Sequence, residues 1–246
     1  MPCVFELHTH TSEVSACGHV PAKQVVHELH DAGYDGCVIT DHMNFHTQEI
    51  ILGVKSVTPE LRTPENWKKI LPAYRRGYDL AREEGERIGM TVLFGCEIRF
   101  PEYENDYLLF GDVFPFLEEN PFISFENAEI GSEVAHRYGL LMVQAHPYRP
   151  NQVPIPSRLL DGMEIYNGNP RHIRHGQNDK AAIYARERNL IPTVGSDYHQ
   201  LGDQGYTATL FADEIHNTDE LVAALRARKY RMTIHPDLTL PLCGAF

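Results

Sequence analysis

The sequence predicts an α/β fold, either a barrel or an open wound sheet. Short apolar runs alternate with amphipathic stretches along the 246 residues, which is the pattern of strands separated by helices. Most of the apolar runs are continuous rather than interrupted by polar residues, as in parallel strands that are buried on both faces. No linker is long or polar enough to divide the chain, so we expect a single domain over residues 1–246.

Seven apolar runs are the expected strands. They cover residues 3–7, 36–40, 91–98, 107–110, 140–145, 162–166 and 191–195. Two segments rich in turn-forming residues, 147–156 and 198–205, are expected to be loops that follow strands.

Three amphipathic stretches between these runs predict helices. The first covers residues 21–32 and ends at Gly33. The second begins at Thr63 and Pro64, a favourable cap and first position, but Pro72 should kink or split it. The third begins near Asn217 and ends in a basic stretch that suits a helix C-terminus.

Charge and composition restrict the partners and the location. Acidic residues outnumber basic ones by 34 to 22, a net charge of −12, which argues against binding long nucleic acids or anionic membranes through a basic face. No run of about 18 apolar residues occurs, and the N-terminus has no secretion signal. The five cysteines form no CxxC pair that would indicate a zinc knuckle or a redox couple. We therefore expect a cytoplasmic protein.

Chemically reactive side chains recur at one kind of place. The chain has 14 histidines, and several of them, together with carboxylates, lie at the C-terminal ends of expected strands. These residues are His8, His10, Asp41, His42, Glu97, His146, Asp197 and His199. In a parallel α/β barrel such strand ends converge on one mouth, where catalytic groups are placed.

The residue types indicate a metal site. Imidazole together with carboxylate suits zinc, iron or manganese, whereas calcium prefers oxygen ligands and structural zinc usually recruits cysteine. His8 and His10 are two positions apart, so on a strand both side chains point to the same face and can bind one ion. The histidines outside strand ends are expected to be structural or solvated: His27, His30, His46, His136, His216 and His235.

The ordered set of motifs resembles the PHP (polymerase and histidinol phosphatase) family of metal-dependent phosphoesterases. The matching stretches are residues 6–11 (ELHTHT), 36–42 (GCVITDH), 95–98 (GCEI), 144–147 (QAHP) and 195–199 (GSDYH). Residues 219–230 also resemble the closing helix of the family. The resemblance implies a distorted, TIM-like (β/α)7 barrel that holds two or three divalent ions, Zn, Mn or Fe.

The resemblance also implies a distribution of ligands. One ion would be held by His8, His10, Glu97 and Asp197, and Glu97 would bridge to a second ion held by His146. The third ion would be held by His19, His42 and His199, where His19 belongs to a Cys-Gly-His element similar to that of the histidinol phosphatase branch. Many members carry a further histidine soon after the glutamate. Leu108 or a neighbour stands in its place, so the second ion has one protein ligand fewer, or its site is weak or empty.

The implied function is hydrolysis of a small phosphate ester by a hydroxide that bridges two ions, with Glu97, Asp197 and Arg149 as catalytic residues. Arg149 is the first candidate to clamp the phosphate oxygens, followed by Arg171 and Arg174. Asp41 is expected to orient a ligand histidine rather than to bind metal. His172 and His175 are candidates for protonating the leaving group.

Three other functions compete with this interpretation. An amidohydrolase-type C–N hydrolase could use the same barrel, because an activated hydroxide attacks a carbonyl as well as phosphorus. A non-catalytic metal-binding protein and a nuclease acting on short oligonucleotides are the other two. The Cys-Gly-His element leans weakly toward histidinol phosphate, and the sequence indicates neither an oligomeric state nor a specific metal.

Overall fold

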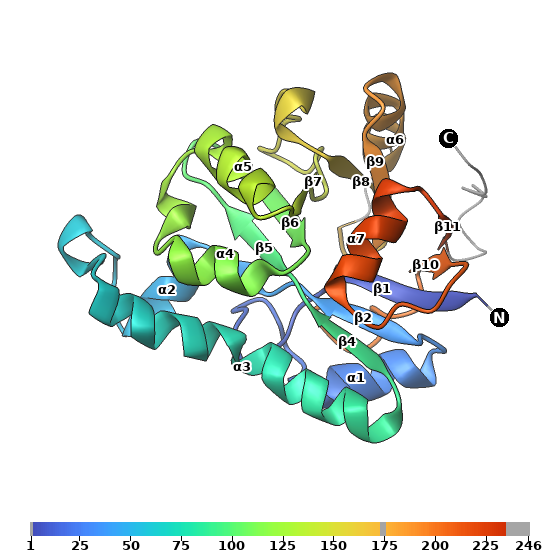
Figure 1. Ribbon diagram of the computed structural model, residues 1–246, viewed down its shortest axis with the longest axis horizontal. Coiled ribbons are helices and arrows are strands. Elements are labelled where there is room, and N and C mark those ends of the chain that lie inside the picture. Colours follow the sequence, from blue (N-terminus) through green and yellow to red (C-terminus); the bar gives the residue numbers. More distant parts are fainter. Residues whose placement is uncertain (1, 173–175, 235–246) are drawn as a thin grey trace.

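The computed structural model describes residues 2–172 and 176–234, which form a mixed α/β fold with two sheets (Figure 1). The strands are β1 (Cys3–Thr9), β2 (Gly36–Ile39), β3 (His42–Met43), β4 (Thr91–Phe94), β5 (Cys96–Arg99), β6 (Asp106–Phe110), β7 (Leu141–Gln144), β8 (Gly162–Asn167), β9 (Ile191–Gly195), β10 (Thr207–Phe211) and β11 (Tyr230–Ile234). One sheet has the order β11-β10-β1-β2-β4, and the other has the order β3-β5-β6-β7-β8-β9.

Helices cover the outer faces of the two sheets. They are α1 (Ala22–Asp31), α2 (Phe45–Leu52), α3 (Pro64–Ile88), α4 (Val113–Glu119), α5 (Ala128–Arg137), α6 (Gln177–Glu187) and α7 (Thr218–Arg226), with short 3-10 turns at Pro59–Leu61, Ile123–Phe125 and Ser157–Leu159. In Figure 1, α3 runs along one side of the molecule, α5 and α6 lie toward the opposite side, and α7 lies between them. None of the described helices is long and apolar enough to cross a membrane.

The expected closed (β/α)7 barrel does not appear in the described part of the chain. The strand expected over residues 91–98 divides at Gly95 into β4, which pairs with β2, and β5, which pairs with β3 and β6. A Cβ atom on Gly95 would lie 2.6 Å from Val38 Cγ1, so the chain passes very close to β2 at the break. The two sheets also approach each other at a parallel bridge between Thr9 and Tyr198.

The strand directions are mixed, which corrects the expectation of a parallel sheet. Parallel pairing holds for β1-β2-β4 and for β7-β8-β9, but β6 is antiparallel to both β5 and β7. Consequently Asp106, the first residue of β6, lies opposite Arg99, the last residue of β5. The strands β10 and β11 are antiparallel as well and were not predicted, because buried and partly exposed residues alternate along β10.

The expected helices are present, with one correction. The helix α3 runs through Pro72 without interruption over 25 residues, because its buried face, which includes Trp67 and Tyr74, packs along the core. The helices α2, α4, α5 and α6 were not predicted. The buried positions of α5 and α6 are mostly small residues, such as Ala128 and Ala181, that give a weak hydrophobic pattern.

The apolar core lies below the ends of the strands that carry the reactive side chains. One apolar cluster combines side chains from both sheets, including Phe5, Val38, Leu108 and Val143, with Leu221 of α7. Polar and charged residues such as His8 and Glu97 are equally buried but lie further along the same strands. The fold therefore places a buried polar layer on top of an apolar one.

Candidate metal centre

Seven of the eight predicted ligands lie together. Among the described residues, the atoms that can bind a metal form groups in which all of them lie within 4.8 Å of one another. The groups are His8, His10 and Asp197; then His8, Glu97 and His146; and then His10, Cys17, His42 and His199. A fourth group joins His42 and Glu97 to Asp106.

Glu97 lies at the centre of this cluster. One carboxylate oxygen is 3.4 Å from His8 Nε2 and 3.1 Å from His146 Nε2. The other oxygen is 3.3 Å from His10 Nε2 and 3.0 Å from His42 Nδ1. The position agrees with the bridging role that the resemblance implies for Glu97.

Several of these atoms are buried without a hydrogen-bond partner, although buried polar atoms are normally paired. They are His8 Nε2, His10 Nε2, His42 Nδ1, Glu97 Oε2 and Asp197 Oδ1. Lone pairs of imidazole and carboxylate converging in this way are the ligands that zinc, manganese and iron bind. The residues present therefore fit divalent cations.

In His8, His146 and His199, the second ring nitrogen forms a hydrogen bond with another protein atom. His8 Nδ1 lies 2.9 Å from Glu164 Oε1, and His146 Nδ1 lies 2.9 Å from Gln152 Oε1. His199 Nδ1 lies 2.7 Å from the carbonyl oxygen of Asp197. Such bonds fix the orientation of a ligand ring and leave the other nitrogen free for a metal.

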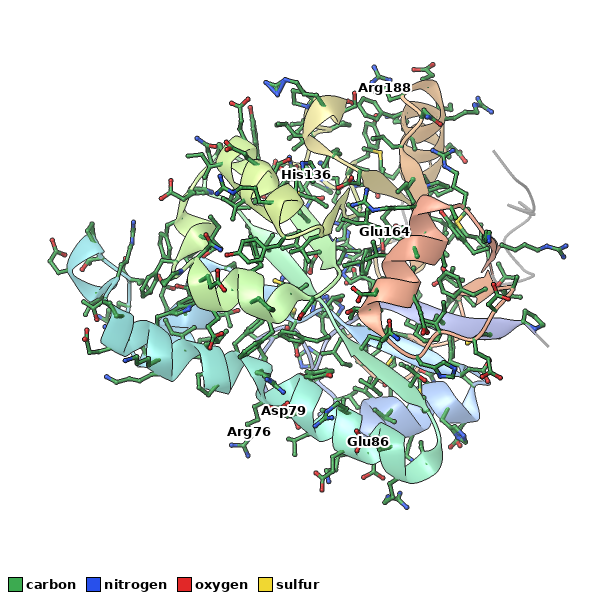
Figure 2. All side chains as sticks on the ribbon, in the orientation of Figure 1. Arg76, Asp79, Glu86, His136, Glu164 and Arg188 are labelled. Atoms are coloured by element: carbon green, nitrogen blue, oxygen red, sulfur yellow. The ribbon has the colours of Figure 1, made fainter. Side chains whose placement is uncertain are left out.

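Glu164 on β8 was not predicted. Its second oxygen accepts the backbone N–H of His146 at 2.9 Å and a bond from Asn167 Nδ2 at 2.9 Å. Figure 2 shows Glu164 in the interior, whereas Arg76 and Glu86 on α3 point outward. A carboxylate inside a fully buried strand was the available signal, because a buried charge requires a partner.

Asp41 acts through a neighbouring serine. It accepts the backbone N–H of Thr11 at 2.8 Å and the hydroxyls of Thr11 and Ser15 at 2.6 Å each. The Ser15 hydroxyl in turn lies 3.2 Å from His10 Nδ1. Asp41 is therefore linked to a ligand ring but is not itself in any of the clusters.

The predicted loop ligand His19 is not in the cluster. Its side chain is exposed, and its backbone N–H donates to the carbonyl of His199 at 2.7 Å. Cys17, two residues earlier, is in the cluster instead, with its sulfur 3.1 Å from His199 Nε2.

The position of the absent family histidine is occupied in part by a carboxylate. Leu108 pairs with Glu97 across the strands and is buried in the apolar core. Asp106, which precedes Leu108 by two residues on the same face, reaches the cluster, and Arg99 binds it with two bonds of 2.7 and 2.6 Å. Because β6 is antiparallel, Asp106 lies at the start of its strand and not at a C-terminal strand end, which is where the sequence predicted ligands.

The predicted phosphate-binding arginines have carboxylate partners. Arg149 donates to Asp197 and, at 3.0 Å, to Asn167. Arg171 binds Asp203 through two bonds of 2.5 and 2.6 Å. Arg174 lies outside the described residues.

One small pocket adjoins the cluster. Its lining includes His146, Arg149, Asn167 and His172. His172, one of the two candidate acids, therefore lies near the predicted clamp, and His175 lies outside the described residues. Burial and the cation of Arg149 lower the pKa of His172.

The pKa values of the residues in the cluster are shifted in different directions. Burial would raise the pKa of Glu97 and of Asp197, but the surrounding histidines and, for Asp197, first of all Arg149 keep both pKa values well below the ordinary range. Burial would lower the pKa of His10, but the carboxylates of Asp197 and Glu97 raise it to about 9. Burial lowers the pKa values of His42 and His199 to about 3, so these rings are neutral and ready to bind a cation.

Two members of the cluster have backbone conformations that residues other than glycine rarely adopt. The φ angle is +28° at His146 and +50° at Asp197. Such strain persists only where the surroundings enforce it, and it is frequent at functional sites. The Glu164 bond to the His146 amide and an Asn169 bond of 2.8 Å to the Asp197 carbonyl hold these two residues in place.

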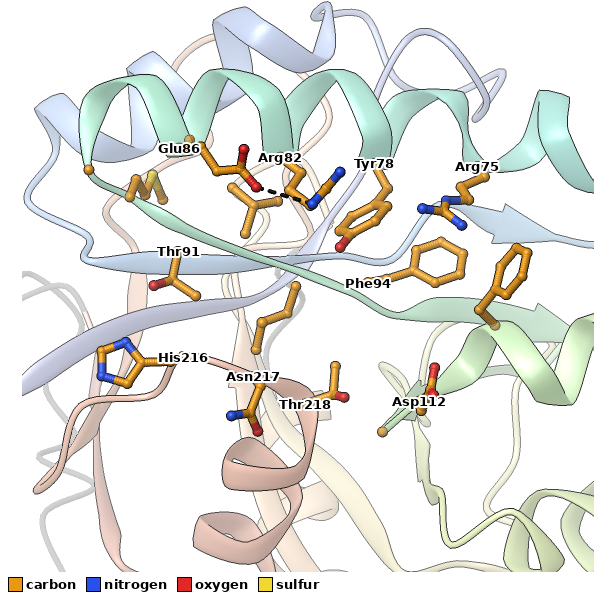
Figure 3. A pocket seen from close by; sticks show the side chains of 17 residues that line it. Arg75, Tyr78, Arg82, Glu86, Thr91, Phe94, Asp112, His216, Asn217 and Thr218 are labelled. Carbon is orange, nitrogen blue, oxygen red and sulfur yellow. Dashed lines mark hydrogen bonds and ion pairs between the residues drawn. The ribbon is translucent and has the colours of Figure 1, made fainter.

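A larger groove lies elsewhere in the described residues. It has a volume of about 720 Å³ and runs between α3, β4 and the start of α7 (Figure 3). Arg75, Arg82 and His216 are among the residues that line it, and none of the clustered ligands does.

Comparisons with known proteins give one family match, over part of the chain, and several similar folds. A family profile described as PHP-associated matches residues 175–230, which include α7. The fold is similar to that of a two-domain protein from Bacteroides vulgatus that contains a predicted PHP-like metal-dependent phosphoesterase, with a TM-score of 0.68, 20% identity and coverage of 98% of this chain and 69% of that chain. No curated protein matches the sequence significantly.

Two further solved structures share the fold. PsfC from Pseudomonas syringae has a TM-score of 0.62 and 15% identity, over 94% of this chain and 91% of that chain. An amidohydrolase from Chromobacterium violaceum, with bound sulfate and no metal, has a TM-score of 0.54 and 13% identity, over 90% of this chain and 96% of that chain.

Proposed function

We propose, starting from the PHP-family membership that the matched segment and the fold support, that the protein is a metal-dependent phosphoesterase acting on a small phosphate ester. The observation that carries this proposal is the convergence of buried, unpartnered ligand atoms from His8, His10, His42, Glu97 and Asp197. Atoms of this kind would be costly to bury unless a cation binds them.

The clustered residues divide into ligand sets for two ions. His8, His10 and Asp197 would hold one ion with Glu97, and Glu97 would share a second ion with His146. When bound, zinc, manganese or iron supplies Lewis acidity and lowers the pKa of coordinated water toward neutrality. Two or three ions would also make the centre locally positive within an acidic protein, which suits a small anionic substrate.

Among the described residues, Arg149 is the best placed to hold a phosphate group. Its guanidinium adjoins the cluster through Asp197, and it lines the small pocket next to His146. Its side chain retains 19% exposure, so part of the guanidinium is available to a ligand. A planar guanidinium can donate two parallel hydrogen bonds to phosphate oxygens.

An amidohydrolase-type reaction on a C–N bond is the second candidate. It is favoured by the pairing of both described candidate arginines with carboxylates, since a phosphatase pocket needs free cations. The fold similarity to an amidohydrolase is consistent with it. A panel of aryl phosphates and aryl amides separates the two candidates, because the proposed function requires turnover of the phosphates.

The direct test combines metal analysis with an assay. The purified protein is analysed for bound metals and then assayed for hydrolysis of an aryl phosphate with added manganese or zinc. We expect at least one ion per chain and metal-stimulated hydrolysis, and we expect Glu97→Ala to abolish both. Fewer than one ion per chain, with no stimulated turnover, would overturn the proposal. Glu118→Ala, at an exposed position on α4, is the control.

A further inference from the structure

The loop between β1 and α1 brings a thiol to the edge of the cluster. Cys17 Sγ lies 3.1 Å from His199 Nε2, and metal-binding atoms of Cys17, His10, His42 and His199 all lie within 4.8 Å of one another. The His10 ring is stacked between the other two imidazoles, with centroid distances of 4.6 Å to His42 and 4.3 Å to His199.

Two nitrogens of this group make no hydrogen bond, although carboxylate oxygens lie within 3.3 Å of each. His42 Nδ1 and His10 Nε2 are buried without a hydrogen bond, and the His10 side chain is fully buried. The His199 Nδ1–H donates to the Asp197 carbonyl, so its Nε2 is the atom that faces Cys17. The group therefore offers buried imidazole nitrogens without hydrogen bonds in addition to the cysteine.

The loop backbone determines which side chain points inward. Gly18 N–H donates to the Ser15 carbonyl at 2.9 Å, and a Cβ atom on Gly18 would lie 2.6 Å from the Thr11 carbonyl oxygen. Only glycine fits at this close approach. The turn leaves Cys17 partly buried beside the histidines and His19 exposed.

We propose that Cys17, and not His19, is the loop ligand of a third ion, and that its thiolate makes this position the most zinc-selective in the centre. The proposal rests on the proposed metal centre. On binding, the sulfur forms a bond to the ion and the thiol proton is released to solvent. Thiolate ligands select zinc over manganese, whereas the Glu97 and Asp197 sites combine imidazole with carboxylate and accept either metal.

The test is cobalt substitution of the full-length protein. Co²⁺ bound to a thiolate has a charge-transfer absorption in the near ultraviolet that imidazole and carboxylate ligands do not produce. We expect this absorption in the wild-type protein and in His19→Ala, and we expect its loss in Cys17→Ser. The other described cysteines, Cys3, Cys37 and Cys96, are buried, belong to none of the clusters and are unchanged in all three proteins.

Zinc content gives an independent measurement. Under competition with a chelator, the wild-type protein and His19→Ala should retain one zinc ion more than Cys17→Ser. Absence of the charge-transfer band from cobalt-loaded wild-type protein would overturn the proposal even if the serine variant does not fold, as would loss of an ion in His19→Ala. A wild-type protein with the band but without phosphate-ester hydrolysis would instead contradict the proposed function and leave the Cys17 ligand in place.

Discussion

The carboxylate of Glu164 contacts two histidines of the cluster at once. One oxygen lies 2.9 Å from His8 Nδ1, and the other accepts the backbone N–H of His146 at 2.9 Å. Glutamine at this position would keep the shape but would direct an NH₂ group at one of these donors. We therefore expect Glu164→Gln to weaken metal binding by about 10- to 100-fold, as changes behind metal ligands commonly do.

Metal affinity measured by competition with a coloured chelator checks this prediction. Glu118→Gln makes the same chemical change at an exposed position and should bind metal like the wild-type protein. Equal affinities in all three proteins would contradict the role assigned to Glu164.

Replacing Arg149 tests the phosphate clamp. We expect Arg149→Ala to lower kcat/KM for an aryl phosphate by about 10- to 150-fold, because a hydrogen bond to a charged group is worth about 1.5–3 kcal/mol. The metal content should be nearly unchanged, because Asp197 faces the metal cluster with its other oxygen. Arg171→Ala is the matched control, since both of its bonds go to Asp203. An equal loss of activity in both variants, or loss of metal in Arg149→Ala, would refute the clamp.

The sequence located the centre well where a simple rule applied. His8 lies near the end of β1, Glu97 follows the end of β4, and His146 and Asp197 lie just beyond β7 and β9; their side chains meet in space. The C-terminal ends of parallel strands lie at one edge of a sheet, so the order of these residues in the sequence was sufficient to predict that they lie together.

The residues that the sequence did not reveal depend on features with no linear signal. Asp106 enters the cluster from the start of an antiparallel strand, and the direction of β6 could not be read from its apolar run. Cys17 replaces His19 because of a turn at Gly18, whose close approach to Thr11 is a matter of tertiary packing. The division of one expected strand at Gly95 has the same kind of cause.

Gly77 tests how tightly α3 supports the centre. A Cβ atom at this position would lie 2.2 Å from Thr11 Oγ1 and 2.7 Å from Asp41 Oδ2, the two atoms that form a 2.6 Å hydrogen bond. Alanine favours a helix by up to about 1 kcal/mol over glycine, but overpacking a core costs about 1–3 kcal/mol. We expect Gly77→Ala to lower the free energy of unfolding, and also to weaken metal binding, since Asp41 positions Ser15 beside a ligand histidine.

Urea unfolding of the metal-free proteins measures the first effect. Arg76→Ala, an exposed change one residue away on the same helix, should leave stability within about 0.5 kcal/mol of the wild-type protein. If Gly77→Ala is as stable as the Arg76 variant, the contact between α3 and Asp41 is looser than the structure indicates.

Pro72 lies inside α3, which continues through it although the sequence predicted a kink or a break. Proline has no N–H to donate to the carbonyl four residues earlier, that of Lys68, and an interior proline costs a helix about 3 kcal/mol. Its ring is exposed, so little packing would be lost on replacement. Proline also restricts the unfolded chain, which offsets about 0.4–1 kcal/mol of that cost. We therefore expect Pro72→Ala to raise the free energy of unfolding by about 2 kcal/mol, seen as a higher urea midpoint at an unchanged slope. An unchanged or lower midpoint would mean that the packing of Trp67 and Tyr74 depends on the bend that proline imposes, and that this bend is part of how α3 fits the core.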